Sequence, residues 1–400
     1  MNIVKESRIS VLHIARWYPN KYDPMPGLFI QRHAEAASKY CDNSAVYVQA
    51  IEDDGSKSTF QVEYEDIRGV KTVCVYYHQP NTVIPFFNKL IKMFRFYKAN
   101  FLGIKKIKEK QGDFDIMHIH ILTRLGVIGL YYKLFKNKPF LVSEHWSRYL
   151  DATADFKGVL RKKLTQIIVK HASFVTTVTD NLARAMKSHG LNNNNYFVLD
   201  NVVDNVFYKT KVSISKNQNK TSFVNVTCFT DKAKNISGLL RVIKSLSEIR
   251  SDFEFILIGE GEDLQEMQDY ANKLGLNDDS VQFRGLMEGE ALAQEMANAD
   301  LLVMFSNYEN LPVVINECFV MGVPTVSTDV GGIKEILDNS NGVLIDARDE
   351  SELIKTLNNY LDKKLVFDTD SIKAEFTERF SPKTIGFELF KLYEKALDAK

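Results

Sequence analysis

Short apolar runs alternate along the chain with longer segments in which apolar residues recur at helical spacing. The first run, Ile9 to Ala15, is almost entirely apolar, which is typical of a strand buried on both faces of a parallel sheet. Repeated alternation of this kind predicts strand–helix–strand units. The fold class is therefore α/β, with mainly parallel sheets covered by helices.

The segment from Lys209 to Thr221 interrupts this alternation. It is polar and rich in lysine and asparagine, which is typical of a linker or surface loop. The full length of 400 residues also exceeds what one hydrophobic core usually supports. We therefore predict two Rossmann-like, doubly wound domains, residues 1–205 and 206–381, that face each other across a cleft.

The pattern places the elements of each domain as follows. Strands are expected in the first domain at 9–15, 45–50, 70–77, 114–118, 139–143, 174–179 and 196–199, with a helix at 28–40. Strands are expected in the second domain at 223–229, 253–258, 281–283, 301–305 and 325–327, with helices at 237–249, 264–274, 290–298 and 313–321. Ligands in such sheets bind beyond the carboxyl ends of the strands, so candidate site residues should follow the strands directly.

Composition and charge exclude several function classes. The 51 basic and 51 acidic residues give no net charge, so no global field favours nucleic acid. The 4 cysteines lack metal-ligand spacing. The first residues do not form a signal peptide, and no apolar run reaches the length of a membrane span. We therefore expect a cytoplasmic protein.

Two glutamates follow the strand expected at 301–305. Glu309 lies in the loop before the next helix, and Glu317 lies about two turns later, inside the apolar run Val313–Val320. An unpaired charge is costly in such a run, which favours a binding role for Glu317. Carboxylates accept paired hydrogen bonds from vicinal hydroxyl groups, so this pair suits a nucleotide-sugar. The competing interpretation is two solvated surface glutamates.

The ends of this helix are also marked in the sequence. Pro312 fits its first turn, and Asn310 could cap it. Gly322 is expected as a left-handed cap at its end. Free backbone N–H groups at the helix start favour negative charge or hydroxyl oxygens.

The stretch SNYENLPVVINECFVMGVPTVSTDVGGIKEIL, residues 306–337, closely resembles the donor-site block of glycosyltransferase family 4, whose members have the GT-B fold. The E-x7-E motif of that family corresponds to Glu309 and Glu317. The resemblance implies that Glu309 contacts the transferred sugar, that Glu317 binds the ribose, and that backbone amides around Asn310 and Leu311 face the sugar or diphosphate. It also implies that the last helix, residues 382–400, crosses back onto the first domain.

Further residues match this family. Gly27, in the block that runs from Trp17 to Ala34, resembles the glycine loop that lets backbone amides approach the donor diphosphate. Lys234 corresponds to the lysine that neutralises the diphosphate. His145 corresponds to a histidine between the domains, near the transferred sugar. The resemblance thus implies catalytic roles for Glu309 and His145, and we expect Trp17 and His120 on the acceptor side.

The chain departs from the family at one position of the donor site. Phe229 stands where the family usually has an arginine, five residues before the lysine. Lys232 or Arg284 are candidates to replace that charge. For each matched residue taken alone, a structural or solvated role is the competing interpretation.

No cofactor motif is complete. Gly259 and Gly261 follow a strand, but Leu264 occupies the third glycine position of a dinucleotide fingerprint. We find no phosphate-binding P-loop and no aspartate pair in a suitable metal-binding loop. We therefore expect a metal-independent enzyme with no cofactor beyond its UDP- or GDP-linked co-substrate.

Residues 86–110 form a basic amphipathic segment, with eight basic residues and one acidic residue, Glu109. Its apolar residues recur at helical spacing: Phe86, Phe87, Leu90, Met93, Phe94, Tyr97 and Phe101. Such a helix can lie on an anionic membrane as a peripheral attachment. The alternative, which the sequence supports equally, is that the aromatic residues pack against the first sheet.

Together these features predict a retaining glycosyltransferase. It would transfer a hexosyl group from a UDP- or GDP-sugar to a glycan or lipid-linked acceptor, in the synthesis of surface polysaccharide or glycoconjugates. Two alternatives remain open. One is a catalytically silent glycan-binding or scaffold protein with the GT-B fold, which Phe229 favours, and the other is a GT-B nucleotide-sugar epimerase.

Overall fold

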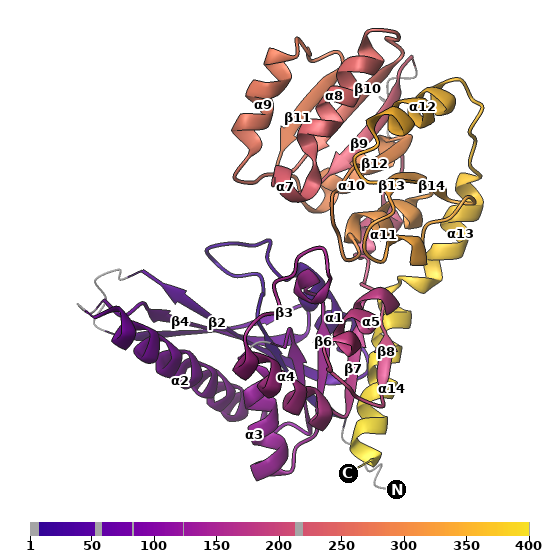
Figure 1. Ribbon diagram of the computed structural model, residues 1–400. Coiled ribbons are helices and arrows are strands. Elements are labelled where there is room, and N and C mark those ends of the chain that lie inside the picture. The colour runs from indigo at the N-terminus through magenta and orange to yellow at the C-terminus, as the bar shows by residue number, and fades with distance from the viewer. Residues whose placement is uncertain (1–7, 53–57, 82–83, 123, 213–218, 400) are drawn as a thin grey trace, which may run out of the picture.

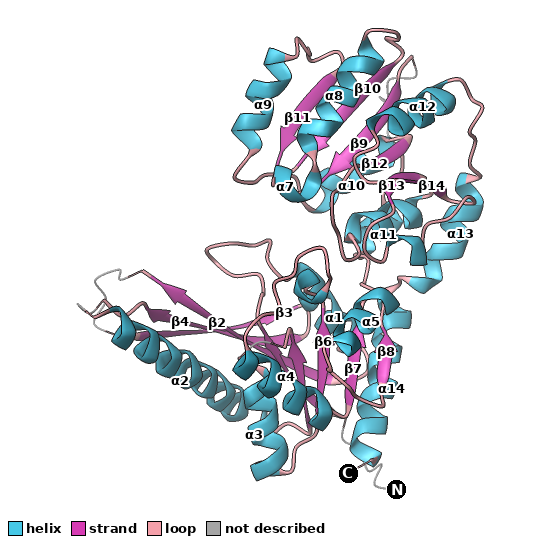
Figure 2. Cartoon of the chain, in the orientation of Figure 1, coloured by secondary structure: helices cyan, strands magenta, loops and turns pink. Residues whose placement is uncertain are grey.

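The computed structural model describes residues 8–52, 58–81, 84–122, 124–212 and 219–399. It contains two α/β halves stacked on each other, and the C-terminal helix runs down to the far end of the first half (Figure 1). Each half is a sheet with helices packed against it (Figure 2). The predicted fold class is thereby confirmed. Part of the predicted linker, residues 213–218, lies outside the described residues.

Within the described residues, the first half contains an eight-stranded sheet in the order β3-β4-β2-β1-β5-β6-β7-β8. Its strands are β1 (Ser10–Ala15), β2 (Asp42–Ile51), β3 (Phe60–Ile67), β4 (Val70–His78), β5 (Ile116–His120), β6 (Phe140–Glu144), β7 (Phe174–Thr177) and β8 (Tyr196–Val198). All neighbours run parallel except β3, which is antiparallel to β4. The carboxyl ends of β1, β5 and β6 therefore meet at one edge, where predicted site residues lie.

Helices cover both faces of this sheet. They are α1 (Leu28–Ala37), α2 (Pro85–Gln111), α3 (Gly126–Lys136), α4 (Val159–His171) and α5 (Asp180–Ser188). Leu12 of β1 packs with buried residues of α2 to α5, whereas Val11 packs with α1 and the C-terminal helix α14 (Pro382–Asp398). Because neighbouring residues of a strand face opposite sides, this double burial explains why β1 is apolar throughout.

The second half contains a parallel sheet with six described strands, in the order β11-β10-β9-β12-β13-β14. The strands are β9 (Thr221–Val226), β10 (Phe253–Ile258), β11 (Val281–Gly285), β12 (Leu301–Met304), β13 (Thr325–Thr328) and β14 (Gly342–Ile345). The helices are α6 (Asn205–Lys209), α7 (Asp231–Lys234), α8 (Ile236–Ser247), α9 (Leu264–Lys273), α10 (Gly289–Asn298), α11 (Val313–Met321), α12 (Glu350–Leu361) and α13 (Thr369–Arg379). β9 and β12 are adjacent, so the segments that follow them converge.

The C-terminal helix α14 returns to the first half and packs beside α1. Ile385, Leu389, Leu392 and Tyr393 share a buried apolar cluster with Val11 of β1. The hydroxyl group of Tyr393 lies 2.8 Å from Nδ1 of His118, whose Nε2 lies 2.7 Å from the hydroxyl oxygen of Ser143. This hydrogen-bonded chain fastens α14 to the middle of the first sheet.

His118 belongs to a fully buried group with His13 and His120. Nδ1 of His13 lies 3.0 Å from Nε2 of His120, which places one donor and one acceptor between the two rings. Burial lowers the pKa of His13 to about 4 and that of His118 well below its ordinary value, so these rings are neutral at pH 7. Neutral rings can satisfy one another without placing a charge in the core.

The substitution Tyr393→Phe tests the attachment of α14. It leaves Nδ1 of His118 without its partner in a buried position, so we expect the free energy of unfolding to fall by about 1–3 kcal/mol. Urea denaturation measures this change. Tyr40→Phe is the matched control, because the Tyr40 hydroxyl group bonds the Lys383 carbonyl at 3.2 Å in a solvent-accessible place. Equal losses in the two variants would contradict a special role for the buried contact.

Candidate functional site

The loop between β12 and α11 presents a buried carboxylate. Oε1 of Glu309 accepts hydrogen bonds from Nζ of Lys234 at 2.6 Å and from the hydroxyl group of Ser306 at 2.8 Å. Glu309 is 9% exposed, and the Lys234 side chain is also largely buried. Burial by itself lowers the pKa of Lys234, but the Glu309 carboxylate outweighs it and the pKa is raised. The two residues form an ion pair at the carboxyl ends of adjacent strands.

A glycine turn supports this loop from behind. Gly331 has a φ of 63°, and a Cβ atom there would lie 2.3 Å from the carbonyl oxygen of Glu309. Only glycine allows this approach. The backbone N–H of Gly332 donates to the carbonyl oxygen of Asn310 at 2.8 Å. The turn therefore fixes the backbone on which Glu309 is held.

The helix α11 starts at Val313, with Pro312 in the N-cap position and Gly322 as a left-handed cap at the other end. The expectation that Asn310 caps the helix is wrong. Its Nδ2 donates instead to the carbonyl oxygen of His145 at 3.0 Å, and its Oδ1 accepts from the Thr179 hydroxyl group at 3.2 Å. Asn310 thus joins the loop to the first half of the chain.

The backbone N–H groups of Asn310 and Leu311 have no hydrogen-bond partner among the residues that the structure describes. The Leu311 side chain is buried in the core between the second sheet and α11. The two amides therefore remain as donors beside the Glu309 carboxylate. This arrangement suits an oxygen-rich, negatively charged ligand.

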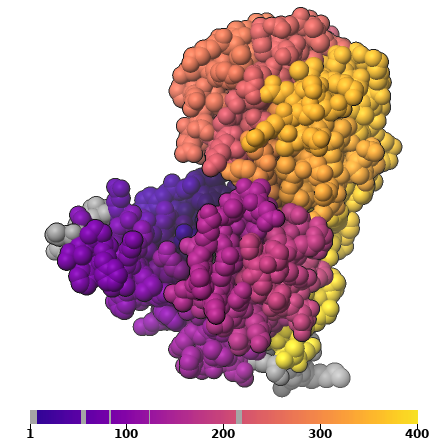
Figure 3. Space-filling model, in the orientation of Figure 1, coloured from indigo at the N-terminus to yellow at the C-terminus, as the bar shows by residue number. Residues whose placement is uncertain are grey.

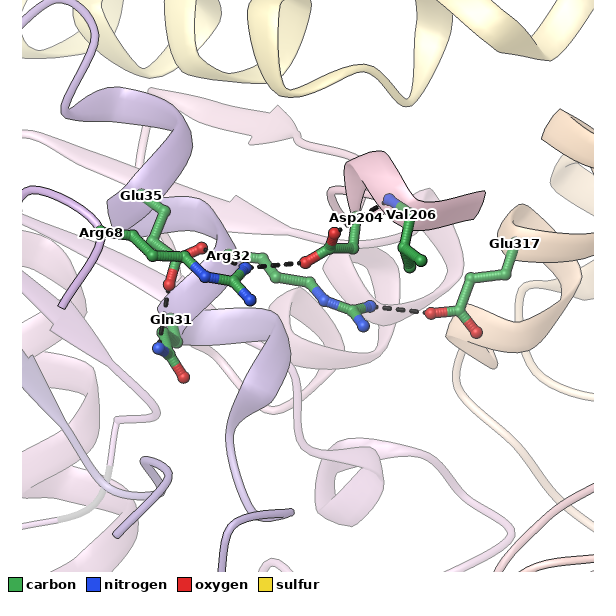
Figure 4. Close-up of polar contacts among 7 residues, drawn as sticks. All are labelled: Gln31, Arg32, Glu35, Arg68, Asp204, Val206 and Glu317. Atoms are coloured by element: carbon green, nitrogen blue, oxygen red, sulfur yellow. Dashed lines mark hydrogen bonds and ion pairs between the residues drawn. The ribbon is translucent and has the colours of Figure 1, made fainter. Parts of the chain in front are cut away.

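Glu317 reaches across to the first half. Its Oε1 accepts a hydrogen bond from Nη1 of Arg32, on α1, at 2.8 Å, and both side chains are largely buried (Figure 4). The sequence pattern drew attention to Glu317 but gave no sign of Arg32, because residues 285 positions apart share no local period. The pair ties the second predicted donor-site carboxylate to the opposite domain.

A second group of charges lies next to this pair (Figure 4). Nη1 of Arg68 contacts Oε2 of Glu35 at 3.3 Å and Oδ2 of Asp204 at 2.9 Å. Oδ1 of Asp204 accepts from the backbone N–H of Val206 at 3.1 Å and so caps α6, which precedes the predicted linker. These contacts join α1, which carries Arg32, to the start of α6.

His145 follows β6 at the boundary between the halves. Its ring lies 4.6 Å from the Phe29 ring and 5.7 Å from the His33 ring, measured between centroids. Both of its ring nitrogens are buried and have no hydrogen-bond partner among the described residues. Burial, followed by the charge of His33, lowers its pKa, so the imidazole is neutral and keeps one donor and one acceptor for a ligand.

Glu144 fixes the turn that carries His145. Its carboxylate is fully buried and accepts backbone hydrogen bonds from Leu122 at 3.0 Å, from His145 at 3.0 Å and from Trp146 at 2.9 Å. Burial raises the pKa of Glu144, against the effect of these hydrogen bonds. We assign it a positioning role, because its partners are the backbone groups that shape the turn.

The remaining predicted residues of the first half lie near His145. Gly27 caps α1 with a φ of 78°, and a Cβ atom there would lie 2.3 Å from the Trp17 carbonyl oxygen. The Trp17 ring contacts the Trp146 ring, with centroids 5.1 Å apart. His120 is fully buried, with its ring 6.2 Å from that of His145. His120, which was expected on the acceptor side, therefore lies in the buried interior of the first half.

The region around the family's arginine position is apolar. Phe229 is fully buried in the core of the second half, and its ring lies 6.0 Å from that of Phe283. Arg284 is exposed on the edge strand β11 and forms no ion pair with any described residue, and Lys232 is exposed on α7. Neither cation contacts Glu309 or Lys234.

A cavity of about 470 Å³ lies where the halves meet, next to Glu309. Its lining includes Leu150, Asn181 and Arg184 from the first half and Asn307, Glu309 and Gly331 from the second. In Figure 3 the surface is notched between the two halves. Because the lining comes from both halves, the cavity can bring together two ligands, one held by each half.

Comparison with known proteins identifies relatives over most of the chain. The N-acetylgalactosaminyltransferase of Campylobacter jejuni that acts on a GalNAc-α-(1→4)-GalNAc-α-(1→3)-diNAcBac-PP-undecaprenol is 22% identical over 309 residues, covering 75% of this chain and 78% of that protein. The lipopolysaccharide 1,6-galactosyltransferase of Escherichia coli is 24% identical over 226 residues, covering 54% of this chain and 61% of that protein.

Solved structures resemble the whole chain. Anabaena Alr3699/HepE in complex with UDP-glucose superposes with a TM-score of 0.68 at 16% identity, covering 98% of this chain and all of that one. This similarity establishes a shared fold. The family model for glycosyltransferase family 4 matches residues 30–206, and the model for glycosyl transferases group 1 matches residues 207–379. The chain therefore belongs to glycosyltransferase family 4, its second half matches the group 1 model, and it has the GT-B fold.

Proposed function

We propose that the protein is a retaining hexosyltransferase that uses a UDP- or GDP-sugar and a glycan or lipid-linked acceptor in the synthesis of surface polysaccharide or glycoconjugates. The observation that carries this proposal is the buried ion pair between Lys234 and Glu309 at the cavity between the halves. Lys234 offers a positive charge that can bind a diphosphate. Next to it, the Glu309 carboxylate can accept hydrogen bonds from sugar hydroxyl groups. The relatives that transfer galactose and N-acetylgalactosamine, and the HepE complex with UDP-glucose, support the same chemistry.

In this proposal the bound donor replaces two ion pairs, Lys234–Glu309 and Arg32–Glu317, that the protein forms between its own residues. Lys234 turns from Glu309 to the diphosphate, and the backbone N–H groups of Asn310 and Leu311 add donors to it. Glu309 then accepts hydrogen bonds from the sugar. Glu317 binds the ribose hydroxyl groups and for this must be released from Arg32. Donor binding is thus coupled to the contact between the halves.

The reaction breaks the bond between the anomeric carbon and the β-phosphate oxygen and forms a bond from that carbon to an acceptor oxygen. With attack from the face on which the phosphate departs, the configuration is retained. The acceptor proton passes to the departing phosphate, so no separate protein base is needed. Lys234 supplies the positive charge that stabilises the leaving diphosphate, and no step requires a metal ion.

The neutral ring of His145 has a donor and an acceptor available at the boundary between the halves. We assign it a hydrogen bond to the transferred sugar near the reacting carbon. Asn310 places the sugar-binding loop against the His145 backbone, so both halves contribute to one site. His145 and Glu309 would therefore approach the sugar from opposite sides.

The basic helix α2 supports a peripheral position on an anionic membrane. One face packs on the first sheet through Phe96, Ala99, Ile104 and Ile107. The other face exposes apolar side chains to solvent: Phe86, Phe87, Leu90, Met93, Phe94 and Phe101. Of the aromatic and apolar residues for which packing against the sheet was the alternative, Tyr97 is partly buried against the core and the six others are exposed. Among the described residues, no helix is both long and apolar enough to cross a bilayer.

A catalytically silent glycan-binding protein is the second candidate, and Phe229 is the observation that favours it. The residue is buried in the core, so the donor site lacks the arginine that usually assists the lysine. Lys234 must then hold the diphosphate with backbone amides alone. The two candidates differ in whether bound donor is turned over.

The first test removes the positive charge of Lys234. For the unsubstituted protein, we expect at least one donor from a panel of UDP- and GDP-sugars to bind in calorimetry and to be slowly hydrolysed. Lys234→Ala should weaken this binding by at least about tenfold, because it removes a charge-assisted hydrogen bond to the phosphate. Lys232→Ala, in the same short helix but exposed, should leave binding unchanged. Equal effects of the two substitutions would contradict the assignment of Lys234.

The second test separates the two glutamates. Glu309→Ala should abolish sugar transfer or donor hydrolysis, by at least about 100-fold in kcat, because Glu309 orients the sugar. Glu317→Ala should mainly weaken nucleotide binding and raise the KM for the donor. Steady-state kinetics with the donor identified above, and circular dichroism to verify folding, measure the difference. Small and equal effects of both substitutions would refute this division of roles.

A further inference from the structure

A second cavity, of about 350 Å³, lies entirely in the first half of the chain. Four arginines line it: Arg16, Arg124, Arg148 and Arg161. Aromatic rings complete its wall, including Tyr97, Trp146, Tyr149 and Phe156. None of the described residues that line it is acidic. A pocket of this composition attracts an anion with several oxygen atoms.

The positive charges of this pocket are poorly compensated. Arg16, Arg124 and Arg161 form no ion pair with any residue in the described part of the chain. Arg148 stacks on the Trp146 ring, with its Cζ 3.3 Å from the ring centre, and its ion pair among the described residues is with the exposed Asp155 at 3.6 Å. The Nε atoms of Arg16 and Arg148 are buried and without a hydrogen-bond partner. Unsatisfied buried donors are costly unless a ligand accepts their hydrogen bonds.

The strand order explains why the arginines converge. Arg16 directly follows β1, Arg124 follows β5 and Arg148 follows β6, and these three strands are neighbours in the parallel sheet. Arg161 comes from the first turn of α4. Burial, together with the positive charge of Arg124, lowers the pKa of Arg16, as expected where like charges gather. The arginines thus crowd together at the strand ends that face the second half.

The mouth of this pocket opens onto an exposed apolar surface. Leu160 lines the pocket and is 82% exposed, and its neighbour Val159 is 75% exposed. The same surface continues over α3 and α2, whose Tyr131 and Phe101 rings lie 5.7 Å apart. Its further exposed members are Leu164, Ile167, Leu134, Phe135 and Phe94. An apolar surface of this extent beside an anion pocket fits a ligand with a charged head and a long hydrocarbon tail.

We propose that this arginine pocket binds the phosphate or diphosphate of a lipid-linked acceptor, whose hydrocarbon tail lies along the exposed apolar residues of α4, α3 and α2. Charge complementarity selects the head group, and the apolar surface selects the tail. The inference rests on the proposed function, because it names the acceptor class of that reaction.

The position of the pocket agrees with an acceptor role. Tyr149 lines the arginine pocket, and the next residue, Leu150, lines the cavity that contains Glu309. A sugar attached to the bound phosphate can therefore extend past this segment towards the donor site. The exposed apolar surface and the arginine pocket would hold the acceptor, while the second half binds the donor.

Farnesyl diphosphate serves as the probe, with farnesol and inorganic diphosphate as its two parts. Calorimetry should show that farnesyl diphosphate binds the full chain, that diphosphate alone binds at least about tenfold more weakly, and that farnesol does not bind measurably. The double variant Arg124→Ala/Arg161→Ala should weaken binding of farnesyl diphosphate by at least about tenfold. Both arginines are exposed, so folding should be preserved, which circular dichroism verifies.

The matched control is Lys163→Ala/Lys170→Ala, which removes the same charge from exposed positions that do not line the pocket. It should leave binding unchanged. An equal loss in this control, diphosphate binding as tight as that of farnesyl diphosphate, or no binding of the probe at all would each overturn the proposal.

Lys234→Ala separates this inference from the proposed function. It should leave binding of farnesyl diphosphate unchanged, because the donor lysine is not part of the arginine pocket. If Lys234→Ala weakens probe binding and the arginine variant does not, the probe occupies the donor site and the acceptor assignment fails. The donor assignment would remain intact in that case.

Discussion

The buried ion pair between Lys234 and Glu309 is the contact around which the proposed donor site is organised. Removing two charges from water is costly, and such a pair persists only where its geometry is well supported. The support comes from the sheet order: β9 and β12 are adjacent, so the segments after them bring lysine and glutamate together. The Gly331 turn and the Ser306 hydroxyl group then hold the carboxylate in place. In the proposed function, the diphosphate replaces Glu309 as the partner of Lys234, and sugar hydroxyl groups replace Lys234 as the partner of Glu309.

Paired polar side chains also connect the two halves at their boundary. Glu317 is paired with Arg32, and Asn310 is bonded to the His145 backbone, so two residues of the E-x7-E block contact the opposite domain. Glu335 adds a third contact, since it accepts two backbone hydrogen bonds of 2.6 Å from the start of α5. In the proposed function, ribose binding to Glu317 competes with the ion pair to Arg32. On that proposal, the affinity for the donor and the relative position of the halves are linked.

Local patterns in the sequence predicted the fold well where strands are buried and helices are capped. The helix Val313–Met321 and the strand Phe253–Ile258 have the predicted bounds. The antiparallel edge strand β3 was missed because its residues are mostly exposed and polar, and the strand β14 was missed as well. Sequence also indicated Glu309, Lys234 and His145. It could not indicate Arg32 or the arginine pocket, because their contacts join segments far apart in the sequence.

We propose that the Lys234–Glu309 pair opens when a diphosphate-sugar binds. A crystal structure of the protein with its nucleotide-sugar donor would show whether this happens. We expect Nζ of Lys234 to lie about 3 Å from a diphosphate oxygen and Glu309 to accept hydrogen bonds from the sugar. A complex in which Lys234 and Glu309 remain paired, while the nucleotide binds elsewhere, would contradict it.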